Sequence, residues 1–349
     1  MVNMNALLKK TMEVGASDLH ITVNSPPIVR IDGKLHHTEL PILNSDQTKA
    51  VIYSILNDEQ KSAFERDREL DFSFSLPDMD RYRINVHYQK GNVEAAFRRI
   101  PKEIPKIEDL GIPKVAYDLI RKPNGLVLVT GPTGMGKSTT LAAMIDVINS
   151  EREEMIICIE DPIEYMHVNK KSIIKQREIY SDTRSFPEAL RRALRQDPDV
   201  IVVGEMRDLE TIGTALTAAE TGHLVLATLH TPDAPQTVQR IIDVFPPHQQ
   251  KQIRVQLADC LQGVISQLLL SRAQGKGRVL ATEVLIATPG IKNLVREEEV
   301  AQIPSLIQMG GQYGMHTMDK CLKEYYKKGF ITREVAVSKV KNIMEFDSL

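Results

Sequence analysis

One eight-residue segment, Gly131–Ser138, constrains the fold of this chain more than any other feature. It reads Gly-Pro-Thr-Gly-Met-Gly-Lys-Ser and matches the phosphate-binding pattern GxxxxGK[ST] at every required position. An apolar run predicted to be a buried strand, Leu126–Thr130, precedes it, and a predicted helix, Ser138–Asn149, follows it. Because this pattern is diagnostic when it joins a strand to a helix, the context predicts a nucleotide-binding α/β domain.

The residues of this loop have separate expected tasks. Glycines let backbone N–H groups face the phosphates, and the start of the following helix adds a partial positive charge. Lys137 is expected to reach the β- and γ-phosphates of a nucleoside triphosphate, and the hydroxyl of Ser138 to bind Mg²⁺. The predicted nucleotide-binding residues are Gly131, Pro132, Thr133, Gly134, Met135, Gly136, Lys137, Ser138 and Thr139.

Carboxylates follow two later predicted strands. Val200–Val203 leads into Gly204-Glu205, and Met155–Ile159 leads into Glu160-Asp161-Pro162-Ile163-Glu164. Ligands of open α/β sheets bind at the carboxyl ends of the strands. We therefore expect Glu205 on the Mg²⁺ side, and Glu164, with Glu160 as second choice, to orient or deprotonate the attacking water. A solvated acidic loop is the alternative interpretation of the second segment.

Histidines and arginines supply further candidates. His223 begins and His230 ends another predicted strand, where each could sense the γ-phosphate, bridge a subunit interface or be structural. Multi-subunit NTPases often receive an arginine from a neighbouring subunit. Candidates for that role in trans, with solvated arginines as the alternative, are Arg81, Arg83, Arg98 and Arg99.

The pattern of predicted helices and strands changes near residue 100. Before it, Asp32-Gly33 predicts a hairpin turn, a helix is predicted over Ser45–Leu56, and Asn57 with Gln60 is predicted to cap a second helix. Period-2 alternation predicts antiparallel strands over Asp71–Ser75, Arg81–Tyr88 and Val93–Ile100. We therefore expect a smaller α+β domain over residues 1–100, and a proline-containing linker, including Pro101, over residues 101–113.

After the linker, strands and helices alternate. This pattern predicts an α/β domain over residues 114–349 with a mostly parallel, doubly wound sheet. Its C-terminal tail is expected to be largely helical, with one helix over Pro247–Leu270 and a strand-like interruption at Arg278–Ile286.

Composition excludes several classes of protein. The 349 residues carry 44 Lys+Arg against 46 Asp+Glu, which argues against a protein held to nucleic acid by bulk positive charge. No apolar run approaches the roughly 20 residues that span a bilayer, and no secretory leader is predicted. The three distant cysteines exclude a disulfide framework or a tetracysteine zinc site. We expect a cytoplasmic protein that does not insert into a membrane.

Longer motifs carry a family resemblance. Leu194–Asp208 resembles the signature of secretion and type IV pilus ATPases, and Ile159–Glu164 with the two histidines is similar to their aspartate and histidine boxes. Gly15–His20 resembles the family's N-terminal motif. Gly290–Glu297 is similar to the motif Ala-Ile-Arg-Asn-Leu-Ile-Arg-Glu of the PilT branch, the pilus retraction motors. It departs from that motif at Gly290, Lys292 and Val295.

The resemblance implies a homo-hexameric ring of subunits, each with a PAS-like N-terminal domain and a RecA-like C-terminal ATPase domain. It implies that Lys137 and Ser138 bind MgATP, that Glu205 supports Mg²⁺ and that Glu164 activates water. His223 and His230 would link the phosphate state to domain position. The ring would power type IV pilus retraction, and so twitching motility, against an inner-membrane platform protein at the cytoplasmic face of the membrane.

Two alternatives stay open at this point. The chain could be an accessory, nucleotide-dependent retraction factor of the PilU type that docks on a paralogous retraction ATPase. It could also be a RecA-like nucleic-acid translocase, which the balanced charge disfavours.

Overall fold

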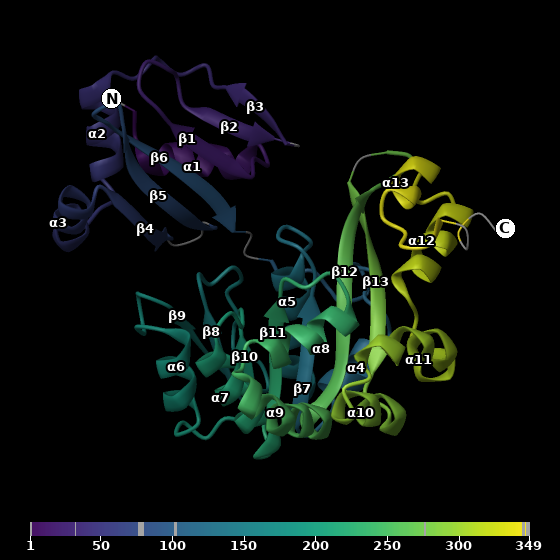
Figure 1. Cartoon of the computed structure of the whole chain (residues 1–349). Helices are drawn as coiled ribbons and strands as arrows, with labels where there is room; N and C mark the ends of the chain where they lie inside the picture. The colour runs from purple at the N-terminus through teal and green to yellow at the C-terminus, as the bar shows by residue number, and fades with distance from the viewer. Residues whose placement is uncertain are drawn as a thin grey trace. The chain divides into compact units, whose positions relative to one another are not determined.

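The computed structural model describes residues 2–31, 33–75, 80–100, 103–275, 277–343 and 346 (Figure 1). The chain divides into two compact units. The first comprises Met1–Glu103 and the short segment Glu164–Met166, and the second comprises Ile104–Ile163 and His167–Leu349. Ile107 is buried in the core of the second unit, so the latter part of the expected linker packs with that unit. Pro101 lies outside the described residues.

The first unit is a six-stranded sheet with helices against one face. All of its strand pairs are antiparallel, in the order β3-β2-β1-β6-β5-β4. Its elements are α1 (Met4–Glu13), β1 (Asp18–Ile21), β2 (Ile28–Ile31), β3 (Lys34–His37), α2 (Ser45–Tyr53), α3 (Asp58–Asp67), β4 (Glu69–Phe74), β5 (Arg81–Gln89) and β6 (Asn92–Ile100). This architecture confirms the predicted α+β class and the three predicted strands.

Local sequence signals account for the helices of this unit. Asn57 caps α3 by accepting from the backbone N–H of Gln60, whose side chain accepts in return from the backbone of Asn57. Asn44 and Gln47 form the same reciprocal pair at the start of α2, which ends at Tyr53, three residues earlier than predicted. The predicted hairpin joins β2 to β3, although Asp32 itself lies outside the described residues.

The second unit is built on a seven-stranded sheet in the order β13-β12-β7-β11-β10-β8-β9. The strands from β12 to β9 are parallel, and only β13 is antiparallel to its neighbour β12. The strands are β7 (Gly125–Thr130), β8 (Met155–Glu160), β9 (Ile173–Glu178), β10 (Val200–Val203), β11 (Leu224–Leu229), β12 (Leu261–Ser271) and β13 (Arg278–Ile286). The predicted mostly parallel sheet is confirmed.

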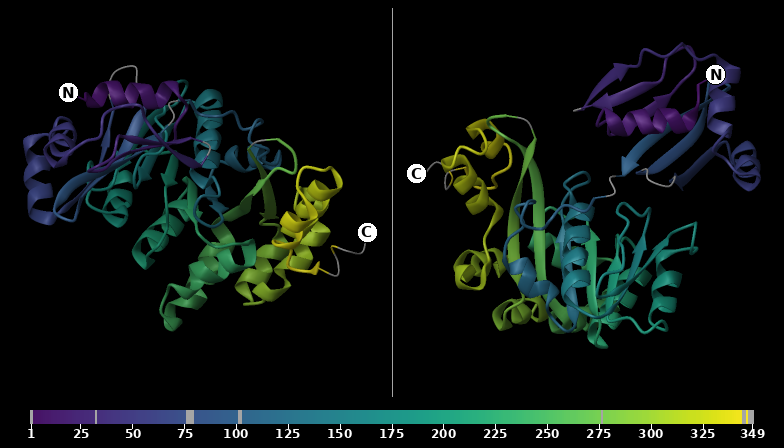
Figure 2. Two further views of the ribbon diagram at one scale, coloured as in Figure 1. Left: turned by 90° about the horizontal axis from the view of Figure 1, so that it is seen from above. Right: turned by 180° about the vertical axis from the view of Figure 1, so that it is seen from behind.

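Helices cover both faces of this sheet, with α7, α8 and α9 on the face seen in Figure 1 and α4 and α5 on the face seen from behind in Figure 2. The helices are α4 (Val115–Ile120), α5 (Lys137–Glu151), α6 (Phe186–Ala193), α7 (Leu209–Glu220), α8 (Ala234–Asp243), α9 (Pro247–Cys260), α10 (Pro289–Arg296), α11 (Ile303–Met309), α12 (Met318–Lys327) and α13 (Arg333–Val337), with short 3₁₀ turns at Val300–Gln302 and Gly310–Tyr313. Every residue of β7, β10 and β11 is buried, as expected for strands covered on both faces.

The predicted helix over Pro247–Leu270 is wrong in its second half. Helix α9 ends at Cys260, and the next residue begins β12. The run Leu261–Leu270 is apolar along much of its length, and such a run is compatible with either a buried helix or a buried strand. Pairing with β7 on one side and β13 on the other makes it a strand. The remaining tail from Pro289 is helical as predicted.

The motif Gly290–Glu297 lies on α10 and is anchored to the end of α9. Lys292 Nζ donates to the backbone oxygen of Asp259 at 2.9 Å, and Arg296 pairs with the Asp259 carboxylate at 2.5 Å. Lys292 therefore makes a single hydrogen bond to a carbonyl at the C-terminus of α9, where a positive charge is favoured. Among the described residues, no helix is long and apolar enough to cross a membrane.

Candidate active site

Four loops of the second unit meet at one edge of the sheet. Strands β8, β10, β11 and β7 are consecutive neighbours and parallel, so their carboxyl ends share that edge. The phosphate loop follows β7, His230 follows β11, Glu205 follows β10, and Glu160 is the last residue of β8. The sheet order therefore places the main predicted site residues along one line.

The phosphate loop requires glycine for steric reasons that the structure makes explicit. Gly131 has φ of +141°, and a Cβ there would collide with the backbone oxygen of Gln267. Gly136 has φ of +81°, with Leu269 Cδ1 only 3.2 Å from where a Cβ would stand. Helix α5 begins at Lys137 directly after Gly136, so the first N–H groups of the helix open onto the loop.

The Lys137 side chain is folded back along this loop. Its Nζ donates to the backbone oxygens of Gly131 at 2.8 Å and Pro132 at 3.1 Å, and the residue is buried. The ammonium thus lies on the loop that is expected to enclose the phosphates.

His230 connects Glu205 to the phosphate loop. Its Nε2 lies 2.7 Å from Glu205 Oε1, while its Nδ1 lies 3.3 Å from Lys137 Nζ and 3.2 Å from Thr133 Oγ1. An ammonium can only donate, so Nδ1 must accept and the ring proton must be on Nε2, from which it is donated to Glu205. The arrangement selects one neutral tautomer and joins three strand-end loops through one imidazole.

The Gly204–Glu205 turn is held by the neighbouring strand. Thr228 Oγ1 donates to the backbone oxygen of Gly204 at 2.6 Å, and the backbone N–H of Met206 donates to Thr228 O at 3.1 Å. Glu205 also pairs with Arg207 at 2.5 Å, and this hydrogen bond raises the pKa of Arg207. Glu205 is consequently oriented by two basic side chains.

A pocket of about 580 Å³ opens beside these residues. It is lined by Thr133, Glu205, Met206, Arg207, Leu229, His230, Thr231, Pro232 and Arg240. The lining combines the phosphate loop with the ends of β10 and β11, and it includes two arginines that suit a polyanionic ligand.

Gln267 supports the phosphate loop, although no pattern in the sequence predicts this role. Its Nε2 donates to the backbone oxygen of Met135 at 2.7 Å, and the residue is fully buried on β12. Once Leu261–Leu270 is assigned to a helix, nothing places Gln267 beside β7. Only the pairing of Ser266 with Thr130 brings the neighbouring residue Gln267 under the loop.

Three predicted residues are placed differently from the group around His230. His223 precedes β11 and therefore lies at the amino end of that strand, about 20 Å along it from His230. Its side chain bonds to the backbone oxygen of Ala218 at 2.9 Å. Glu160 Oε1 accepts from Gln176 at 3.0 Å. Glu164 is exposed and is not among the pocket-lining residues.

The first unit separates its four candidate arginines into two groups. Arg83 on β5 lies directly opposite Arg98 on the neighbouring strand β6. Arg81 is on the same side of β5 as Arg83. Arg99 is on the other side, opposite the buried Tyr82, and is tied to Asp80. Arg98 pairs with Asp18 at 3.2 Å but stays largely exposed.

Together, the parallel sheet, the strand–loop–helix phosphate motif and the carboxylate at the end of β10 define a P-loop NTPase with a RecA-like domain. The chain belongs to the family of type II/IV secretion system proteins, whose family model matches residues 1–337. This confirms the family resemblance seen in the sequence.

Individual relatives show which members of this family the chain is similar to. The type IV pilus retraction ATPase PilT of Pseudomonas aeruginosa is 51% identical over 97% of this chain and 98% of its own length. The type IV pilus ATPase PilU of the same organism is 40% identical over 95% of this chain and 87% of its own. A crystal structure of the pilus retraction motor PilT with bound ADP matches all of both chains with a TM-score of 0.94 at 48% identity.

Proposed function

We propose that this protein is an ATPase that powers type IV pilus retraction, and so twitching motility. The observation that carries the proposal is the link from Glu205 through His230 to Lys137, built at the sheet edge where P-loop enzymes bind nucleotide. Similarity to PilT over nearly the whole of both chains supports retraction as the task, and confirms the function predicted from the sequence.

The phosphate loop fits a nucleotide. Its positive-φ glycines, the first turn of α5 and the Lys137 ammonium bring hydrogen-bond donors to the loop. The loop sequence Gly131–Ser138 contains no carboxylate that would repel a phosphate. Residues 131–139 hold the phosphates, and Lys137 moves from the loop carbonyls to the β- and γ-phosphates when ATP binds.

Ser138 and Glu205 would hold Mg²⁺ together with the nucleotide. Bound there, the ion neutralises charge that develops on the transferring phosphoryl group. Glu205 keeps its orientation through its bonds to Arg207 and His230. His230 responds to the position of Lys137 because the Lys137 ammonium contacts its Nδ1 atom.

Glu164 orients or deprotonates the attacking water, and Glu160 is the second candidate for this role.

The working particle is a homo-hexamer in which the first unit acts as the PAS-like domain. Arg81, Arg83 and Arg98 of one subunit are the candidates to reach the phosphates of a neighbour, whereas Arg99, the fourth arginine predicted from the sequence, pairs with Asp80 on the core side of its sheet. His223 has its role in linking the phosphate state to domain position rather than beside the phosphates of its own subunit. The ring works on an inner-membrane platform protein at the cytoplasmic face of the membrane.

The experiment is MgATP hydrolysis as a function of protein concentration, with Lys137→Ala as the blank. A specific rate that rises and then saturates supports a site completed by a neighbour. A constant specific rate with a hexamer by light scattering supports a preformed ring. A constant rate from a monomer contradicts the ring.

A rate no higher than that of the blank contradicts the motor and favours the accessory factor of the PilU type. The identities of 51% to PilT and 40% to PilU favour the motor. Hydrolysis stimulated by DNA would instead support the translocase.

A further inference from the structure

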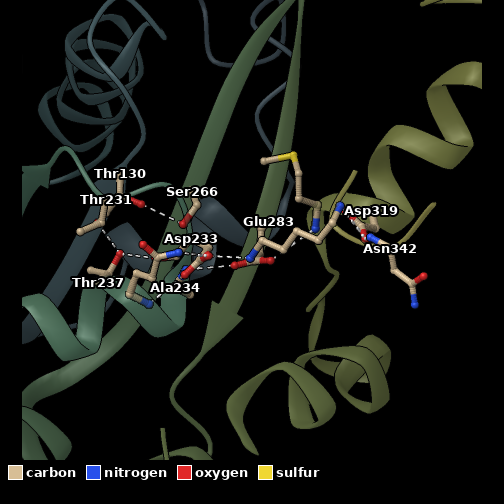
Figure 3. Close-up of polar contacts among 12 residues, drawn as sticks. Thr130, Thr231, Asp233, Ala234, Thr237, Ser266, Glu283, Asp319 and Asn342 are labelled. Carbon is tan, nitrogen blue, oxygen red and sulfur yellow. Dashed lines mark hydrogen bonds and ion pairs between the residues drawn. The ribbon is translucent and has the colours of Figure 1, made fainter. Parts of the chain in front are cut away.

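Three buried polar residues form a row across the larger sheet. Thr130 ends β7, Ser266 lies opposite it on β12, and Glu283 lies opposite Ser266 on β13. The hydroxyls of Thr130 and Ser266 are 2.8 Å apart (Figure 3). One end of the row is Thr130, which directly precedes the phosphate loop. The other end is Glu283, whose carboxyl group has no role in the proposed mechanism.

Glu283 joins the starts of two helices. Its carboxyl oxygens accept from the backbone N–H of Ala234, the first residue of α8, at 2.9 Å, and of Met318, the first residue of α12, at 3.4 Å. The first N–H groups of a helix have no partner within the helix, so one side chain completes two helix ends. Burial raises the pKa of Glu283, and the two N–H donors oppose that shift.

A lysine from the C-terminal segment, residues 317–342, reaches the same place. Lys341 Nζ lies 2.5 Å from Oδ2 of Asp233, whose other oxygen caps α8 by accepting from the N–H of Gln236 at 2.8 Å. Burial is the largest single effect and disfavours the charged lysine, but the hydrogen bond and charge of Asp233, together with the charges of Glu283 and Asp319, raise the pKa of Lys341. Asp319 fixes the lysine's backbone by accepting from the N–H groups of Lys341 and Asn342 at 3.0 and 3.1 Å.

Hydrogen bonds continue from this point to the active-site loop (Figure 3). Thr237 Oγ1 donates to the backbone oxygen of Asp233 at 2.6 Å, so the Thr231 hydroxyl, also at 2.6 Å from it, must be the donor of their shared bond. Thr231 directly follows His230. The first turn of α8 therefore sets where the backbone of His230 lies.

We propose that Lys341 is a positioning residue for His230, acting through Asp233 and the first turn of α8. Asp233, Glu283 and Lys341 together form a clamp, the α8 clamp, that ties the C-terminal segment to the active site. The inference rests on the proposed function, because it gives the C-terminal segment control over a residue that links Glu205 to Lys137. A contact that merely adds stability would not act through His230.

The first test is a double-variant cycle on ATP hydrolysis. Lys341→Ala is expected to lower kcat about threefold, on the scale of one ion pair to a buried carboxylate, with KM for ATP unchanged. Lys341→Arg restores the rate. Lys339→Ala is the matched control, since Lys339 is an exposed lysine of the same segment whose side chain makes no ion pair within the described residues. In a His230→Gln background, Lys341→Ala should cause no further loss.

An equal loss in both backgrounds overturns the proposal, because Lys341 would then act independently of His230. So does an unchanged kcat in Lys341→Ala alone. Additivity is the expected behaviour of residues that do not share a path.

The second test is independent of turnover. Hydrogen exchange of the full-length protein should show faster exchange at the amides of Ala234 and Gln236 in Lys341→Ala but not in Lys339→Ala, since both amides donate to residues of the α8 clamp. Unchanged exchange overturns the inference even if the protein is an active ATPase. Conversely, faster exchange in a protein without hydrolysis above the Lys137→Ala blank supports the α8 clamp while the proposed function fails.

Discussion

His230 Nε2 donates to Glu205 Oε1 at 2.7 Å, while the other nitrogen of the same ring accepts from Lys137 at 3.3 Å. One neutral imidazole thus joins the carboxylate assigned to the Mg²⁺ side and the ammonium assigned to the phosphates. A change at either partner alters the hydrogen bonding of the other, which is the property required of a residue that reports the phosphate state.

Replacing His230 should therefore reduce turnover more than it reduces stability. His230→Ala removes both the donor to Glu205 and the acceptor for Lys137, and we expect kcat to fall about tenfold or more. His230→Gln keeps an amide that can donate and accept, so its loss should be smaller. Steady-state phosphate release measures both, with the exposed His248→Ala on α9 as the control. Equal rates for His230→Ala and the wild type would exclude the link from the mechanism.

The assignment of the water-activating carboxylate is tested by a pair of isosteric variants. Glu164→Gln should keep ATP binding and lose turnover by about 10²-fold or more, because an amide cannot take a proton. Glu160→Gln should lose less, since Glu160 already accepts from Gln176. Binding of a fluorescent ATP analogue and hydrolysis are measured on each. Normal turnover in Glu164→Gln with loss in Glu160→Gln would transfer the role to Glu160.

The first-unit arginines can be tested for action in trans by mixing subunits. Arg83→Ala leaves the phosphate loop intact, while Lys137→Ala leaves the arginines intact. If Arg83 serves a neighbour, a mixture of the two inactive proteins should regain part of the wild-type rate after subunit exchange. Arg98→Ala is tested in the same way. No recovery at any ratio would show that these arginines do not complete a neighbouring site.

Arg99 provides the contrast for that experiment. Arg99 is on the core side of the sheet and pairs with the buried Asp80, so Arg99→Ala removes an ion pair to a buried carboxylate. We expect a lower melting temperature rather than recovery on mixing.

Gln267 should matter for nucleotide affinity through the phosphate loop alone. Gln267→Leu removes the donor to Met135 O, and we expect ATP to bind about fivefold more weakly. The free energy of unfolding should change by only about 1 kcal/mol, because Gln267 Oε1 has no hydrogen-bond partner within the described residues and its removal offsets part of the loss. Calorimetric titration with ATP and thermal denaturation separate the two effects. Gln262→Leu, on the same strand at the far edge of the sheet, is the control.

Acid should destabilise the second unit through His316. Burial lowers the pKa of His316, and Nε2 lies 3.0 Å from Thr282 Oγ1. The unfolded chain takes up its proton first as pH falls below about 6.5, so the stability contributed by neutral His316 is present above that pH and is lost toward the folded pKa. Urea unfolding between pH 7.5 and 5 should show a shallower pH dependence for His316→Gln than for the wild type. An unchanged slope, equal to that of exposed His248→Gln, would contradict this assignment.

Features that depend on a few neighbouring residues could be predicted from the sequence. The phosphate loop was placed between its strand and helix because the positive φ angles at Gly131 and Gly136 are demanded by the loop itself. The cap Asn57 is predictable because it bonds to a backbone N–H only three residues ahead. Alternation likewise predicted β5 and β6, whose two sides face different surroundings.

Features that depend on which strands become neighbours could not be predicted from the sequence. His223 and His230 look equivalent in the sequence, at the two ends of one strand, and only the parallel pairing of β11 with β7 decides which end meets the phosphate loop. The apolar run from Leu261 suits a helix or a strand, and its pairing with β7 makes it a strand and puts Gln267 under the loop. The link from Lys341 to Asp233 joins residues 108 positions apart. Local sequence determines local backbone geometry, whereas contacts between distant segments depend on the packing of the whole sheet and its helices, and no local pattern encodes them.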